Sequence, residues 1–192
     1  MTIKERIVIT GRPGVGKTTL IERVVSELSI PAGGMITAEI RKCDHRVGFS
    51  VIDLATGKEG ILAHIHQQSG PKMGRYRVNL HDLEQIGIAA IDRALAAGSL
   101  VVIDEIGPME ITSPAFIPAV ERVVASDAPF IISTHAKLDH PLIHRLRQEF
   151  TLYRVKLGNR DRLIKLICQE FAKPPDATPR PAAGGGLSPG SA

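Results

Sequence analysis

One eight-residue segment near the start of the chain constrains the fold more than any other part of the sequence. Residues 11–18 read Gly-Arg-Pro-Gly-Val-Gly-Lys-Thr, which fits the pattern GxxxxGK[ST]. A β-branched run, residues 6–10, precedes this segment, and residues 17–28 carry apolar side chains at helical spacing. A glycine-rich loop of this kind between a strand and a helix predicts a phosphate-binding P-loop in an α/β domain.

The chemistry of the loop residues predicts their roles. Glycines let a loop wrap closely around an anion with its N–H groups pointing inward, and the helix N-terminus adds a favourable dipole. We expect Lys17 to reach the β- and γ-phosphates and Thr18 to complete the shell of a Mg²⁺ ion. An ordinary turn that caps a helix would explain the glycines but not the Gly-Lys-Thr string. The candidate nucleotide-binding residues of this segment are Gly11, Arg12, Pro13, Gly14, Val15, Gly16, Lys17 and Thr18.

An acidic pair follows a second apolar run and provides the partner that a P-loop requires. Residues 100–107 read Leu-Val-Val-Ile-Asp-Glu-Ile-Gly. We expect Asp104 to hold Mg²⁺ together with Thr18, and Glu105 to polarise a water molecule in line with the γ-phosphate. The string Asp-Glu-Ile-Gly also fits the DxxG motif of GTPases, which adds Ile106 and Gly107 to the candidate nucleotide-binding residues.

GTPases read guanine with an NKxD motif, and this chain departs from that motif. Residues 159–162 are Asn-Arg-Asp-Arg, with arginine where the base-reading aspartate would stand. The glutamate beside Asp104 instead favours the ATPase-like branch of P-loop proteins, in which extra strands lie between the P-loop strand and the acidic strand. Residues 35–65 could provide such strands.

Three further residues are candidates for nucleotide contacts. Thr134 ends a strand that follows the acidic strand, where it could bond the γ-phosphate or the attacking water, or could simply cap the strand end. Asn159 and Arg160 stand near the start of the last helix. There the Arg160 guanidinium could stack on a base, and a solvated arginine is the other interpretation.

The order of the expected elements indicates how the chain is organised. Two strands flank a polar turn at residues 44–46, and a third follows, which predicts an antiparallel hairpin or meander. After it, helices and strands alternate, which predicts a mostly parallel central sheet flanked by helices. We expect one domain over residues 1–172 and a disordered tail, rich in Pro, Gly and Ala, over residues 173–192. The expected strands are 35–43, 47–54, 61–65, 100–103, 130–133 and 152–157, and the expected helices 83–95, 115–124, 141–150 and 161–171.

Composition excludes several classes of protein. With 43% hydrophobic and 23% charged residues, the chain is neither fibrous nor wholly disordered. Its two cysteines, Cys43 and Cys168, stand far apart, so neither a disulfide framework nor a structural zinc site is predicted. No apolar run reaches the roughly 18 residues needed to span a membrane, and the first residues lack the apolar core of a signal peptide. We expect a cytoplasmic protein without a membrane partner, and a monomer rather than an oligomer.

Four strings make a specific resemblance. They are Gly-Gly-Met-Ile-Thr-Ala-Glu-Ile-Arg (33–41), Gly-Phe-Ser-Val-Ile-Asp-Leu-Ala-Thr-Gly (48–57), Arg-Tyr-Arg-Val-Asn-Leu with the following Leu-Glu (75–84), and Val-Ile-Asp-Glu-Ile-Gly-Pro-Met-Glu (102–110). Together the strings resemble the small nucleoside-triphosphatase family first described in thermophiles, which has a human cancer-related relative. The match runs from about residue 7 to residue 164. The resemblance implies a RecA-like fold and Mg²⁺-dependent hydrolysis of ATP, GTP, CTP and UTP with little base preference.

Two other functions stay open at this point. A small nucleoside or nucleotide kinase could use the same loop and metal site, although no compact arginine-rich insertion that would form a lid is evident. A nucleotide-dependent switch could bind RNA through residues 137–173, which carry nine basic and four acidic residues. That flank has only three aromatic residues, Phe150, Tyr153 and Phe171, so it makes a poor stacking platform, and nucleic acid is not the expected partner.

Overall fold

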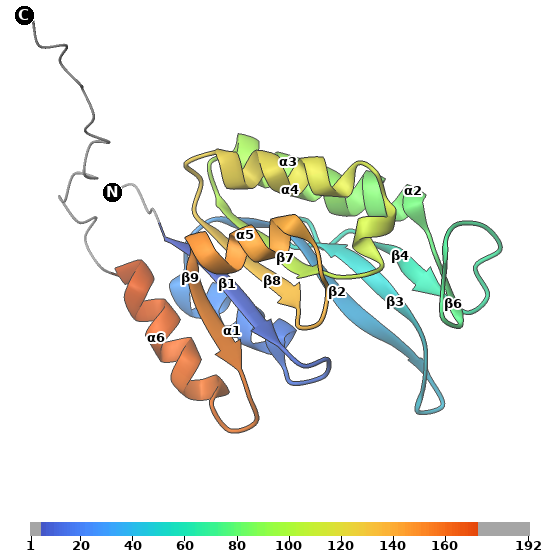
Figure 1. The fold of residues 1–192 in the computed structure, drawn as a ribbon, viewed down its shortest axis with the longest axis horizontal. Helices are drawn as coiled ribbons and strands as arrows, with labels where there is room; N and C mark the ends of the chain where they lie inside the picture. The colour runs from blue at the N-terminus through green and yellow to red at the C-terminus, as the bar shows by residue number, and fades with distance from the viewer. Residues whose placement is uncertain (1–4, 173–192) are drawn as a thin grey trace, which may run out of the picture.

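A computed structural model describes residues 5–172 of the chain, which form a nine-stranded mixed sheet with helices on both faces (Figure 1). The strand order is β5-β6-β4-β3-β2-β7-β8-β1-β9. The strands are β1 (Arg6–Gly11), β2 (Ala32–Lys42), β3 (His45–Asp53), β4 (Glu59–His64), β5 (Lys72–Met73), β6 (Tyr76–Val78), β7 (Leu100–Ile106), β8 (Phe130–His135) and β9 (Thr151–Val155). The α-helices are α1 (Lys17–Leu28), α2 (Leu80–Asp82), α3 (Ala89–Ala96), α4 (Phe116–Ala125), α5 (Pro141–Glu149) and α6 (Arg160–Ala172), with a π-helix, η1 (Leu83–Ile88), and a 3₁₀ turn, η2 (Glu110–Thr112).

Five neighbouring strands, β2, β7, β8, β1 and β9, run parallel, as expected for alternating strands and helices. The P-loop strand β1 and the acidic strand β7 are separated by β8, which pairs with both. The expectation that residues 35–65 provide the intervening strand is therefore wrong. These residues form β2, β3 and β4, which lie on the other side of β7.

The antiparallel meander is confirmed, with one shift in its first turn. β2 pairs with β3 and β3 pairs with β4, both antiparallel. The turn between β2 and β3 is Cys43–Asp44, one residue earlier than expected, and both residues have positive φ, 47° and 60°. Positive φ at both central positions is typical of the tight two-residue turn whose twist suits a hairpin. The short strands β5 and β6, which extend this side of the sheet, were not expected from the sequence.

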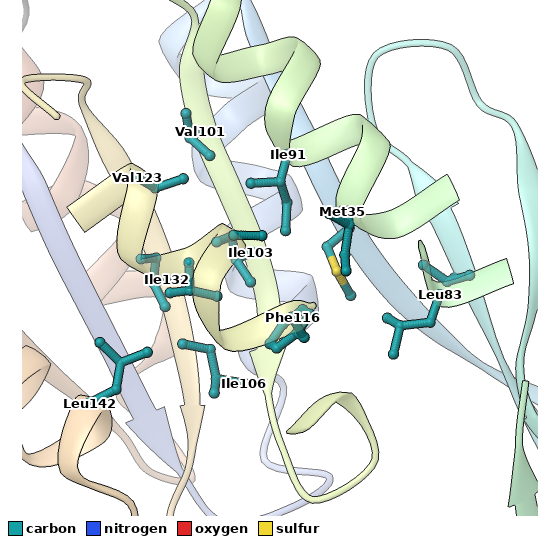
Figure 2. Packing of buried hydrophobic residues seen from close by; sticks show 14 of the residues in the cluster. Met35, Leu83, Ile91, Val101, Ile103, Ile106, Phe116, Val123, Ile132 and Leu142 are labelled. Atoms are coloured by element: carbon teal, nitrogen blue, oxygen red, sulfur yellow. The ribbon is translucent and has the colours of Figure 1, made fainter. Parts of the chain in front are cut away.

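The apolar core lies on both faces of the sheet, because successive side chains of a strand point to opposite faces. On one face, β7 residues Val101 and Ile103 pack with residues of η1, α3, α4 and α5, as Figure 2 shows. On the other face, Leu100 and Val102 belong to a second cluster with α1 and α6. Burial on both sides explains why β7 reads as one continuous apolar run until its acidic pair.

The two ends of the chain fall outside this description. The tail predicted over residues 173–192 lies beyond the described residues. Within residues 5–172, no helix is both long and apolar enough to cross a membrane.

Because β1, β7 and β8 run parallel, their carboxyl ends lie at the same edge of the sheet, and the predicted motifs come together there.

Candidate active site

The P-loop leads from the end of β1 into the first turn of α1. Gly14 and Gly16 have φ values of +73° and +94°, a region that favours glycine. A Cβ on Gly11 would lie 2.9 Å from the carbonyl oxygen of Val155, so a side chain there would collide with β9. Gly16 stands at the N-cap of α1 and no described side chain caps this helix end, which leaves its first N–H groups for an anion. Of the other predicted loop residues, Arg12 and Pro13 are exposed and Val15 is half-buried.

Lys17, Thr18, Asp104 and Glu105 come together at the carboxyl ends of β1 and β7. Lys17 is buried, and its Nζ lies 2.7 Å from Glu105 Oε2 and 3.4 Å from the carbonyl oxygen of Gly11. The Thr18 hydroxyl donates to Asp104 Oδ2 at 2.5 Å. The four residues to which the sequence assigns catalysis and metal binding therefore form one cluster, although 86 residues separate Thr18 from Asp104.

Asp104 is the buried centre of this cluster, with 1% of its surface exposed. Burial raises the pKa of Asp104, and the hydroxyl groups of Ser133 and Thr18, together with the charge of Lys17, act in the opposite direction. Mg²⁺ takes oxygen ligands and is commonly held by one or two carboxylates with substrate phosphates. The residues present fit this ion, because Thr18 and Asp104 offer a hydroxyl and a carboxylate side by side. Residues 5–172 contain no cluster of three or more His, Cys, Asp or Glu that would suit a metal held by protein alone.

Ser133 is a member of the site that the sequence analysis missed. Its hydroxyl donates to Asp104 Oδ1 at 2.5 Å, and the residue is fully buried. The neighbouring Thr134, which was the candidate, bonds elsewhere: its hydroxyl lies 3.5 Å from the carbonyl oxygen of Ile9 and 3.3 Å from Arg147 Nη2. Adjacent strand residues point to opposite faces, so only one of the two hydroxyls can reach Asp104.

The DxxG residues separate into two environments. The Ile106 side chain is fully buried in the apolar cluster that also contains Phe116 and Ile132 (Figure 2), so it offers no polar contact to a ligand. Gly107 lies next to two carboxyl groups. A Cβ on this glycine would stand 2.7 Å from Glu110 Oε2 and 3.3 Å from Glu105 Oε1. Glu110 is thus part of the site's surroundings; from the sequence it could anchor the loop after Asp104 or face water, and its burial excludes the second interpretation.

Asn159 ends the loop between β9 and α6 and Arg160 is the first residue of α6, and the two differ in what they contact. The Asn159 amide closes its own loop, since Oδ1 accepts from the Lys156 N–H at 2.9 Å and Nδ2 donates to the Arg154 carbonyl at 3.0 Å. Arg160 instead lies against the P-loop, with Nη1 3.0 Å from the position of a Cβ on Gly16. Its Nε is buried and has no hydrogen-bond partner among the described residues.

Comparison with known proteins places this chain in a family. A family described as NTPase matches residues 6–168. The chain is 50% identical over 172 residues to the nucleoside-triphosphatase THEP1 of Methanosarcina acetivorans, covering 88% of this chain and 97% of that protein. It is 41% identical over 164 residues to the nucleoside-triphosphatase THEP1 of Thermotoga maritima, covering 84% of this chain and 92% of that protein.

Two solved structures share the fold. The crystal structure of THEP1 from the hyperthermophile Aquifex aeolicus superposes with a TM-score of 0.78 at 32% identity, covering 88% of this chain and 99% of that one. The solution structure of a human cancer-related nucleoside triphosphatase gives a TM-score of 0.71 at 31% identity, covering 86% and 96% of the two chains. The resemblance seen in the four sequence strings is confirmed, and the chain belongs to the nucleoside-triphosphatase (NTPase) family.

Proposed function

We propose that this protein is a Mg²⁺-dependent hydrolase that removes the terminal phosphate of ATP, GTP, CTP and UTP. The observation that carries the proposal is the cluster of Lys17, Thr18, Asp104 and Glu105 at the P-loop. The names of its relatives, which are nucleoside-triphosphatases, support hydrolysis as the reaction.

The P-loop and Lys17 would bind the phosphates. The N–H groups at the start of α1 present partial positive charge, and the Lys17 ammonium group carries a full positive charge. Both suit the β- and γ-phosphates. Mg²⁺, when bound, would be held by Thr18 and Asp104 and would neutralise phosphate charge. In the described structure Lys17 contacts Glu105. Nucleotide binding would therefore move Lys17 from Glu105 to the phosphates.

Glu105 would direct the attacking water. Both carboxylate oxygens of Asp104 already accept hydrogen bonds, from Thr18 and Ser133, so Asp104 is fixed in place. The polar side-chain contact of Glu105 is Lys17 alone among residues 5–172, and Glu105 is 22% exposed. Once Lys17 binds phosphate, the Glu105 carboxylate is free to accept a proton from water or to orient it. This division gives metal binding to Asp104 and water activation to Glu105.

The residues at the start of α6 support broad base specificity. Asn159 does not turn toward a base, because one hydrogen bond at its amide oxygen and one at its amide nitrogen hold the side chain within its own loop. The Arg160 guanidinium beside Gly16 can stack on any base, because every base has a π-face. We therefore expect similar affinity for the four nucleotides.

The experiment is phosphate release from ATP, GTP, CTP and UTP, with Mg²⁺ or with EDTA, and with labelled nucleotide in the presence of added nucleosides. We expect release from all four at rates within about tenfold, no release with EDTA, and all labelled phosphate free in solution. Lys17→Ala is the negative control, because it removes the phosphate-binding ammonium group while leaving the acidic strand unchanged. Label on an added nucleoside would identify a kinase and contradict the proposal.

A further inference from the structure

Glu110 is a buried acidic residue that the reaction described above does not use. It is the first residue of η2, just beyond the end of β7, and only 4% of its surface is exposed. Within residues 5–172, no lysine, arginine or histidine contacts its carboxyl group, which accepts hydrogen bonds from the backbone N–H groups of Glu110 and Gly107 and lies near the negative charges of Glu105 and Asp104. An ionised carboxylate buried without a cation is costly, so this carboxyl group requires an explanation.

The carboxyl groups of Glu110 and Glu105 share the space beside Gly107. A Cβ on Gly107 would be 2.7 Å from Glu110 Oε2, and 3.3 Å and 3.4 Å from Oε1 and Cγ of Glu105. Both side chains therefore border the volume that the missing side chain leaves. Glycine at this position allows the two carboxyl groups to approach each other.

The charge state of Glu110 makes this approach favourable. Burial is the main reason why the pKa of Glu110 is raised to about 8; the negative charges of Glu105 and Asp104 add to the rise, and hydrogen bonds from the backbone N–H groups of Glu110 and Gly107 oppose it. Near neutral pH the Glu110 carboxyl group consequently carries a proton, and a protonated carboxyl group is a hydrogen-bond donor. Two ionised carboxylates that border the same small volume would repel each other, whereas a protonated and an ionised one can share a hydrogen bond.

The need for such a donor arises when nucleotide binds. Lys17 Nζ holds Glu105 Oε2 at 2.7 Å in the described structure, and the proposed function moves Lys17 to the phosphates. Glu105 then loses the polar side-chain partner that fixes its position. Asp104 cannot replace that partner, because it is an acid whose oxygens already accept from Thr18 and Ser133.

We propose that Glu110 is a positioning residue for hydrolysis. Its carboxyl group donates a hydrogen bond to Glu105 once Lys17 has moved to the phosphates, and this bond holds Glu105 toward the attacking water. This inference rests on the proposed function, since it concerns the same reaction. Glu110 does not touch substrate and acts only through Glu105. Its loss should therefore slow the chemical step and leave nucleotide binding nearly unchanged.

The test compares Glu110→Gln with Glu110→Leu, using kcat and KM for Mg²⁺·ATP and the melting temperature. Glutamine keeps the size of the side chain and an N–H donor, whereas leucine keeps only bulk. We expect Glu110→Gln to retain kcat within about threefold and Glu110→Leu to lower it about 10²-fold, the low end of the contribution of a general base. KM should change less than about twofold in both variants.

Gly107→Ala provides an independent test that leaves Glu110 in place. Its methyl group would enter the space that the two carboxyl groups border, so we expect the same loss in kcat as for Glu110→Leu. This variant decides the matter if Glu110→Leu fails to fold. Equal kcat losses in Glu110→Gln and Glu110→Leu, or wild-type kcat in Glu110→Leu or Gly107→Ala, would overturn the inference. Absence of phosphate release by the wild-type protein would instead count against the proposed function.

Discussion

Replacing Glu105 with glutamine tests the division of roles between the two acids of β7. The substitution keeps the shape of the side chain but removes its negative charge and its capacity to take a proton. Because Glu105 holds Lys17 at 2.7 Å, the free protein must break this ion pair before Lys17 can bind phosphate. Glu105→Gln should therefore affect nucleotide binding and hydrolysis in opposite directions.

The size of the binding effect follows from the exposure of the pair. A hydrogen bond between charged groups contributes about 1.5–3 kcal/mol. Lys17 is 7% and Glu105 22% exposed, so solvent around Glu105 weakens the contact, and about 1 kcal/mol is a reasonable figure. Removing that competition should tighten Mg²⁺·ATP binding about fivefold. Hydrolysis should fall at least roughly 10²-fold, because the water-directing carboxylate is gone.

The assay is a titration with a fluorescent ATP analogue beside single-turnover hydrolysis at saturating nucleotide. Asp104→Asn is the matched control, since it neutralises the neighbouring acid of the same strand. It should require more Mg²⁺ for the same nucleotide occupancy. If Glu105→Gln loses binding and keeps its rate once saturated, the assignments of Asp104 and Glu105 are reversed and the reasoning is refuted.

Further substitutions probe other parts of the site. Lys17→Ala should nearly abolish phosphate release, whereas Arg12→Ala should have a mild effect, because Arg12 is exposed. Near wild-type hydrolysis by Lys17→Ala would contradict the role of Lys17 in phosphate binding. Ser133→Ala should lower the free energy of unfolding by about 1–3 kcal/mol in urea titrations, since it leaves a buried Asp104 oxygen without its donor, whereas Ser133→Thr should restore it. Arg160→Ala should raise KM for all four nucleotides by a similar factor, roughly fivefold for a lost stacking contact of about 1 kcal/mol. A change confined to one base would show that Arg160 reads that base instead of stacking on it.

The sequence predicts the parts of the site that are written in continuous segments. The P-loop and the acidic pair each combine an apolar strand with an adjacent polar string, so both the element and its functional residues are visible locally. The four sequence strings indicated the family. The fold class that this resemblance implies is confirmed by the mixed sheet and by the solved structures of relatives.

Features that depend on pairing between distant strands were harder to predict. The choice between Ser133 and Thr134 depends on which face each side chain takes beside β7, and the β7–β8 register is irregular between Ile103 and Ile106. The sequence has a polar residue at both positions and does not set this register. The strands β5 and β6 contain only two and three residues, too few to show a period of two.

The position of β8 between β1 and β7 also affects how the protein folds. Thr10 and Thr134 are neighbours in the sheet but 124 residues apart in the chain, and pairing over such separations forms slowly. During synthesis, β1 and β7 emerge before the strand that joins them. The P-loop and Asp104 therefore reach their final spacing only after β8 has been inserted into the sheet, and a nascent chain that ends before Phe130 has no complete nucleotide site.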